Sequence, residues 1–129
     1  MSYAAIKTAL ESHLLAGADI PVVFDDNRYR KKSKQPFLRA VFQPQKVTPR
    51  LIGANAPQEY QGFLDILIFE SSHMAAVIRA DDLQALFPRG LSLQQSGTTV
   101  HVIGANLTRG PQNLNHNQYR LRLTWRSYF

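Results

Sequence analysis

Residues 59–70 read EYQGFLDILIFE and give the strongest strand signal that precedes the C-terminus. Successive side chains of a strand point to opposite faces of its sheet. One face of this segment carries the apolar side chains of Tyr60, Leu64, Ile66 and Ile68. The other face is apolar as well, so the strand is central in its sheet or its outer face is covered by another chain. The second option gives a candidate subunit interface made of Phe63, Leu67 and Phe69.

The chain after this strand predicts a helix, a hairpin and a last strand. Residues 72–87 begin with a Ser cap and place apolar side chains on one side of a helix, at Ala76, Ala80, Leu83 and Phe87. Residues 89–104 place a Ser-Gly turn between two alternating segments, which is typical of a β-hairpin. The final segment, QYRLRLTWRSYF, alternates cleanly and predicts a terminal strand with Trp125 on its apolar face.

The chain before residue 59 predicts one helix and shorter extended segments. Residues 3–16 carry apolar side chains at helical spacing, and Gly17 follows where a helix terminus favours glycine. The segment IPVVF predicts a strand start or an extended connection, and FLRAVFQ, at 37–43, predicts a strand. Prolines at 44, 49 and 57 argue against a central strand through the next residues, although a ragged edge strand around 47–52 is compatible with them.

These elements predict an α+β fold in one domain spanning residues 1–129. Two helices must each bury one face, and five or six strands are available to bury them, which gives two layers with a mostly antiparallel sheet and both helices packed on it. Polar stretches rich in Asn, Gly, Pro or charge predict mobile loops near 25–36, 43–58 and 105–117.

The composition fits a folded domain without a disulfide framework. The chain has 129 residues, of which 44% are hydrophobic and 19% are charged, as in ordinary globular proteins. It has no cysteine, which excludes disulfides and thiolate metal sites. The N-terminal segment lacks the cleavage site of a signal peptide, and the most apolar run, GFLDILIF, is far shorter than the roughly 20 residues of a membrane-spanning helix. We therefore expect no membrane contact.

The histidines are scattered and predict no metal site. His13 falls on the apolar side of the first helix, where a packed histidine is the expected role, and His101 lies opposite the apolar face of its strand, where it should be solvated. Glu70 and His73 have the spacing of a carboxylate-bridged metal site, but such sites need a second copy and further glutamates from other helices. The sequence contains no second Glu-x-x-His.

No arrangement of residues predicts catalysis. Asp81 and Asp82 adjoin on a helix and point about 100° apart, so they form a solvated surface and no facing carboxylate pair. The sequence also lacks a glycine-rich phosphate loop, a nucleophile elbow and a metalloprotease signature. We expect no enzymatic activity, no catalytic residue and no cofactor.

The densest positive charge lies at residues 28–39, RYRKKSKQPFLR, which hold six of the fifteen cationic side chains of a chain with net charge +6. The candidate contact residues of this loop are Arg28, Arg30, Lys31, Lys32 and Lys34. The loop could be merely solvated, could contact phosphates without reading bases, or could dock on an acidic protein surface. The sequence does not separate these three roles.

The order of these segments resembles the tail terminator, or tail completion, proteins of long-tailed bacteriophages. The resemblance covers almost the whole chain and rests on the opening helix, the loop before PFLRAVF, the strand YQGFLDILIF, the helix ending in ADDLQALFPRG, and the hairpin LSLQQSGTTVHVIG before the terminal strand. The segment from Gln61 to Gly104 is its most specific part. The basic loop departs from the shared pattern.

The resemblance implies an assembly protein of the virion tail that is put together in the host cytoplasm. Such proteins form a ring, usually a hexamer, that caps the completed tail tube, ends its elongation and offers a surface for joining the head. The implied partners are further copies of the chain, the tail tube protein and a head-completion or connector protein. The positive loop could meet either protein partner or DNA in the lumen. The alternative is a small basic nucleic-acid-binding domain that uses residues 28–39.

Replacing Arg30, Lys31 and Lys32 together by Ala should leave the stability of the domain unchanged. Exposed loop charges contribute little to the free energy of unfolding, roughly 0–1 kcal/mol per ion pair. Urea denaturation of both proteins measures this. A triple variant that unfolds would make the loop a packed structural element.

Overall fold

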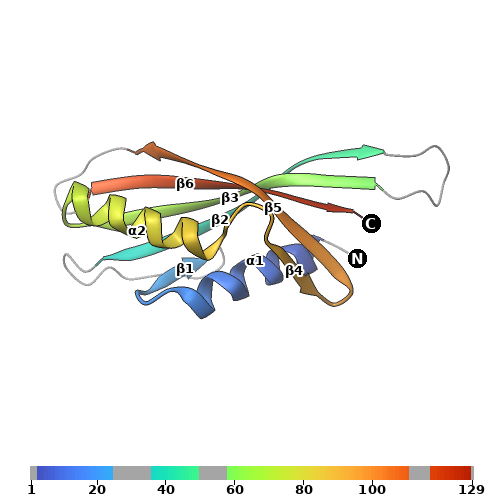
Figure 1. The fold of residues 1–129 in the computed structure, drawn as a ribbon, viewed down its shortest axis with the longest axis horizontal. Coiled ribbons are helices and arrows are strands. Elements are labelled where there is room, and N and C mark those ends of the chain that lie inside the picture. Colours follow the sequence, from blue (N-terminus) through green and yellow to red (C-terminus); the bar gives the residue numbers. More distant parts are fainter. Residues whose placement is uncertain (1–2, 25–35, 50–57, 111–116, 129) are drawn as a thin grey trace.

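A computed structural model describes residues 3–24, 36–49, 58–110 and 117–128 of the chain. Two helices and six strands follow one another in the predicted order (Figure 1). Their bounds are α1 Tyr3–Gly17, β1 Val22–Phe24, β2 Phe37–Pro49, β3 Gln58–Glu70, α2 His73–Leu86, β4 Ser92–Gln95, β5 Thr98–Arg109 and β6 Asn117–Tyr128. Both predicted helices, the hairpin and the terminal strand are present.

The six strands form one sheet with the order β1-β2-β3-β6-β5-β4. Only β1 and β2 run parallel, and the other neighbouring pairs are antiparallel. The last strand of the chain therefore lies inside the sheet, between β3 and β5. This arrangement confirms the predicted α+β fold with a mostly antiparallel sheet.

Both helices pack on the same face of the sheet, which we call the inner face (Figure 1). The buried cluster joins the helices to alternate residues of the long strands, such as Leu64 and Ile66 of β3 and Leu121 and Leu123 of β6. Because strand side chains alternate, the residues between these positions point to the opposite, outer face. Neither described helix covers that outer face.

The turn between β4 and β5 has the geometry of a two-residue hairpin. Ser96 and Gly97 both have positive φ angles, of 51° and 80°. Positive φ at both central positions is the type I′ turn, whose twist matches that of the flanking strands. The Ser-Gly pair was the sequence signal for this hairpin, and the register Gln95↔Thr98 confirms it.

Strand β2 is longer than the sequence predicted. It continues through Pro44 to Pro49, so the predicted loop is a strand up to Pro49. The edge strand that the sequence left open around 47–52 is present at 47–49, and residues 50–57 lie outside the described ranges. The short strand β1 pairs only with Leu38 to Ala40, which leaves the rest of β2 at the edge of the sheet. An edge strand tolerates proline because one side of its backbone needs no donor. The register shifts between Pro44 and Lys46, as in a β-bulge.

Strand β5 also extends into a predicted loop. It reaches Arg109 and pairs with β6 up to Tyr119, so residues 105–109 are strand. Residues 111–116 of that predicted loop lie outside the described part of the chain, as do residues 25–35 of the basic loop. No helix within the described ranges is both long and apolar enough to cross a membrane.

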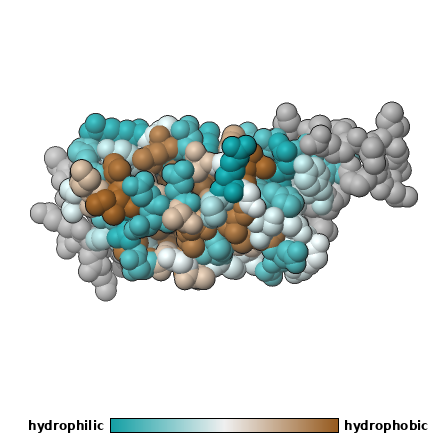
Figure 2. Space-filling view, viewed as in Figure 1, coloured by the Kyte–Doolittle hydropathy of each residue, from teal (hydrophilic) through white to brown (hydrophobic). Residues whose placement is uncertain are grey.

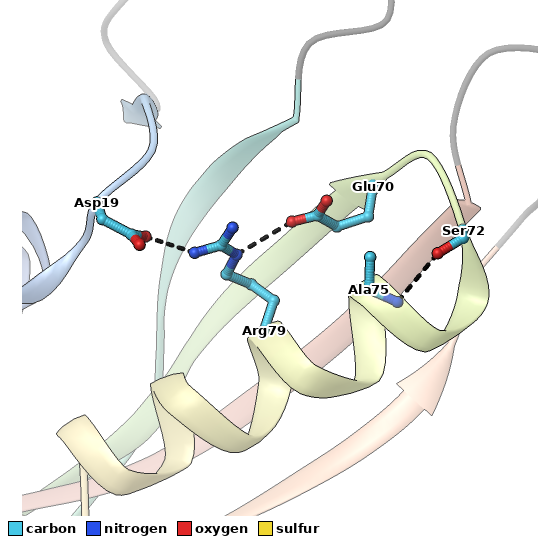
Figure 3. A network of polar contacts seen from close by, with 5 residues as sticks. All are labelled: Asp19, Glu70, Ser72, Ala75 and Arg79. Atoms are coloured by element: carbon cyan, nitrogen blue, oxygen red, sulfur yellow. Dashed lines mark hydrogen bonds and ion pairs between the residues drawn. The ribbon is translucent and has the colours of Figure 1, made fainter.

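Arg79 of α2 forms ion pairs with the sheet and with the residues that follow α1 (Figure 3). Its Nε donates to Glu70 Oε2 over 3.0 Å, at the end of β3, and its Nη1 pairs with Asp19, just beyond α1. Ser72 caps the start of α2, and its hydroxyl accepts a hydrogen bond from the Ala75 amide over 3.1 Å. This cap satisfies one of the free amides of the first turn.

Trp125 of β6 fills the centre of the inner face. It is fully buried, and its ring stacks on Phe42 of β2 with the centroids 5.4 Å apart. The ring passes over Gly62 of β3, where a Cβ atom would come within 2.6 Å of Trp125 Cζ2 and 2.5 Å of the Gln43 carbonyl oxygen. Glycine is therefore needed at position 62 because no side chain fits between the indole and the neighbouring strand.

Trp125→Ala should lower the free energy of unfolding by about 3–5 kcal/mol, because it removes a buried aromatic side chain and leaves a cavity above Gly62. Chemical denaturation monitored by far-UV circular dichroism measures this. Leu15→Ala is the matched control, since Leu15 is 59% exposed on α1 and its truncation should change stability by less than about 0.5 kcal/mol. Equal effects of the two substitutions would contradict the central role of Trp125.

Candidate interface on the outer sheet face

The three residues of the predicted subunit interface lie together on the outer face. Phe63, Leu67 and Phe69 alternate along β3 with inward-pointing core residues, and each is half-buried. The sequence predicted this face and its apolar character. The strands β2 and β6 flank β3 on both sides, and their side chains cover much of this face.

Aromatic and cationic neighbours account for this partial cover. Phe37 of β2 lies opposite Phe69 and stacks on it, with the ring centroids 4.4 Å apart and the planes at 8°. The Arg122 guanidinium of β6 lies over the Phe63 ring, 4.4 Å from its centroid. A cation over an aromatic face is attracted by the ring quadrupole and also shields the ring from water. Within the described part of the chain, the outer face is thus a layer of side chains from the strands themselves.

A buried carboxylate lies in the middle of this layer. Asp65 is 2% exposed and accepts two hydrogen bonds from Arg122, 2.8 Å from Nε to Oδ1 and 3.0 Å from Nη2 to Oδ2. The Gln43 amide donates a third bond to Oδ2 over 2.8 Å. The three residues come from β3, β6 and β2, so the carboxylate joins three adjacent strands. Such a bidentate pair has a more exacting geometry than a single ion contact.

The same contact fixes the charge of the arginine. The hydrogen bonds that Arg122 donates to Asp65 raise the pKa of the Arg122 guanidinium above its ordinary value, and the negative charge of Asp65 acts in the same direction. Partial burial lowers the pKa of Arg122, but by less than the two effects of Asp65 together raise it. Arg122 therefore stays charged, and its charge is neutralised within the sheet.

A second ion pair on the outer face joins Glu59 and Arg126, from β3 and β6. Glu59 is buried, at 6% exposed. Two of the arginines on this face are thus matched by acids. Arg39 and Arg120 have no acidic partner among the described residues, and the Nε atom of Arg120 is buried without a hydrogen-bond partner.

A hollow of about 250 Å³ opens beside Arg120 at one end of the outer face. Its lining includes Leu67 of β3, Thr108 of β5 and Gln118 of β6. The hollow offers an apolar floor, a hydroxyl, an amide and a guanidinium. Polar and cationic groups of these kinds bind carboxylates and other small anions in proteins.

The histidines singled out in the sequence make contacts within the domain. His13 Nε2 lies 2.7 Å from the Leu86 carbonyl oxygen and its ring meets Phe87 edge-on, which confirms a packed histidine. His101 Nδ1 lies 2.9 Å from the Ser92 hydroxyl. Asp81 and Asp82 are exposed on α2, as predicted.

Glu70 and His73 do not face a common site. Glu70 binds Arg79, whereas His73 Nδ1 lies 3.0 Å from the Tyr119 hydroxyl and its Nε2 lies 3.0 Å from Arg109 Nη2. Among the residues that the structure describes, no group of three or more His, Asp or Glu side chains is placed to hold a metal ion. The cationic residues of the predicted contact loop, Arg28, Arg30, Lys31, Lys32 and Lys34, lie outside the described ranges.

The sequence analysis did not predict the ion pair and hydrogen bonds of Asp65. Asp65 lies within the apolar run GFLDILIF and was assigned no role from the sequence. A charged residue inside a strand that is apolar on both faces is a usable signal, because burial of a charge requires a partner. The alternating arginines of the terminal strand were the available candidates for that partner.

Comparison with known proteins identifies similar chains. A family model described as phage tail terminator protein matches residues 3–125. A solved protein structure superposes with a TM-score of 0.80 and 22% identity, covering 100% of this chain and 97% of its own. Eighteen chains of solved structures match in all, and a comparison with curated proteins found no match. The structural likeness, at this identity, concerns the fold.

Asp65→Ala should lower the free energy of unfolding by roughly 2–4 kcal/mol, because it leaves Arg122 and Gln43 without their acceptor in a partly buried layer. Guanidinium denaturation of the variant measures the change. Asp81→Ala removes an exposed carboxylate and serves as control, with an expected change below about 0.5 kcal/mol. An Asp65 variant as stable as the control would show that the pair contributes no net stability.

Proposed function

The chain belongs to the phage tail terminator family and is a structural component of a phage tail, and from this premise we propose that it forms a ring that caps the completed tail tube. In this role the ring ends the addition of tube protein and presents a surface for joining the head. The observation that carries the proposal is the family match across residues 3–125. We propose a hexamer as the assembled form.

The exposed surfaces of the domain are compatible with a ring. Copies in a ring meet head to tail, so each copy uses two different surfaces. The outer sheet face supplies one such surface, with the half-buried Phe63, Leu67 and Phe69. The helix layer on the opposite side is a different surface, and Met74 and Ile78 of α2 are 69% and 53% exposed there. Large apolar side chains left at a surface favour burial against another protein.

We propose that the chain contacts three further kinds of partner in the virion. The tail tube protein lies on one side of the ring and a head-completion or connector protein on the other. The cationic loop around Arg30 and Lys32 would reach one of these proteins or the DNA that passes through the lumen. A binding and assembly role of this kind requires no bond chemistry.

Purified chain added to growing tail tubes of the parental phage should stop their elongation and appear as a ring at one tube end in negative-stain electron microscopy. Light scattering should give the mass of a hexamer in solution or of a monomer that assembles only on tubes. Leu67→Ser should weaken ring formation at least about tenfold, equivalent to about 1.4 kcal/mol, because it removes apolar contact area from the outer face. Leu15→Ser is the control, because it makes the same substitution at an exposed position of α1.

A chain that stays monomeric and leaves tube length unchanged would contradict the proposed role. If that monomer instead bound duplex DNA with a log–log salt slope near roughly −4.5, as expected for about five neutralised phosphates, the nucleic-acid-binding alternative would be favoured.

A further inference from the structure

The outer surface of α2 carries an apolar and acidic stripe. Met74, Ile78, Asp81 and Asp82 follow one another at steps of four, three and one residues, which places them along one side of the helix. Met74 and Ile78 are more than half exposed, and Figure 2 shows apolar side chains reaching the surface over the left part of the molecule, where α2 lies. We call these four residues the α2 stripe.

The acids of the α2 stripe are distinctive because they have no cationic partner among the residues that the structure describes. The other carboxylates of the described residues, on Glu11, Asp19, Glu59, Asp65 and Glu70, each have a cationic partner. Asp81 and Asp82 have none within those ranges. Two adjacent free carboxylates on a protein of net charge +6 are a local concentration of negative charge on a positive molecule.

The outer sheet face carries a complementary set. The register places Arg39 opposite Leu67, and Leu67 opposite Arg120, so one row across three strands reads arginine, leucine, arginine. We call these three residues the arginine row. Neither arginine has an acidic partner among the described residues, and Arg120 lines the hollow at this end of the outer face.

The two sets match in dimensions as well as in charge. Neighbouring strands lie about 4.8 Å apart, so the two arginine backbones flank Leu67 at a spacing of roughly 10 Å. Asp81 and Asp82 diverge by about 100° around the helix axis, which directs their carboxylates to either side of the ridge formed by the stripe. A helix lying on the row would place the ridge over Leu67 and one carboxylate near each guanidinium.

We propose that the α2 stripe of one copy docks on the arginine row of the next copy and forms the repeating contact of the ring. The inference rests on the proposed ring. Asp81 and Asp82 pair with the guanidinium groups of Arg39 and Arg120, while Met74 and Ile78 cover the apolar column of β3. The stripe and the row lie on opposite layers of one chain, so they cannot meet within it. Neighbouring copies can supply an oppositely charged partner for both the stripe and the row.

Charge reversal tests this contact directly. The helix variant carries Asp81→Lys and Asp82→Lys, and the sheet variant carries Arg39→Glu and Arg120→Glu. Each variant alone opposes like charges at every contact and should associate at least about tenfold more weakly than the wild type, equivalent to about 1.4 kcal/mol. An equimolar mixture offers only two kinds of opposite-charge contact, the native one and its reversal. The mixture should therefore restore rings of alternating copies.

The readouts are the mass from light scattering and the rings on tube ends in electron microscopy, at two salt concentrations. Arg120 is half-buried, so Arg39→Glu alone, at an exposed site, serves as a second sheet variant if the double variant unfolds. Gln94→Lys on exposed β4 is the control and should assemble as the wild type does. Variants that form rings as well as the wild type would overturn the docking and leave the ring standing. A wild type that forms no ring, in solution or on tubes, would overturn both.

Discussion

The two helices of the described residues cover one face of this six-stranded sheet and leave the other without a helix, and the character of the outer face follows from that. A sheet face in water needs polar side chains, whereas a sheet face inside a domain needs apolar ones. The outer face here is intermediate, with aromatic residues half-covered by their neighbours and a carboxylate that is almost fully buried. The ion pair of Asp65 and Arg122 makes this layer possible, because it places charge inside the sheet and satisfies it there.

The periodicity of the sequence was sufficient for the elements with strong local signals. Residues 59–70, both helices and the Ser-Gly hairpin were predicted because each carries a pattern set by its own geometry. The continuation of β2 through Pro44 and the extension of β5 were missed for a common reason. Pro44 is compatible with a strand only at a sheet edge, and residues 105–109 are strand because β6 pairs with them. Both facts depend on strand order, which local composition does not encode.

The candidate interface was predictable in composition and not in its contacts. Alternation placed Phe63, Leu67 and Phe69 on one face, and the structure agrees. The partners of Asp65 come from strands that are 22 and 57 residues away in the chain, and the row of Arg39, Leu67 and Arg120 exists only in the observed register. A shift of one residue would turn these arginines toward the core. Register is set by the whole sheet, so no single segment could reveal it.

The distribution of charge between the two layers also bears on how copies can meet. If two copies paired through the same surface, the arginine row would face another arginine row, or two α2 stripes would bring four carboxylates together. Both arrangements oppose like charges, which disfavours a twofold dimer. Contact between an α2 stripe and an arginine row brings opposite charges together. A row of subunits joined in this way keeps one free stripe at one end and one free arginine row at the other. Only closure into a ring satisfies both ends, so the charge pattern favours the closed assembly over a pair.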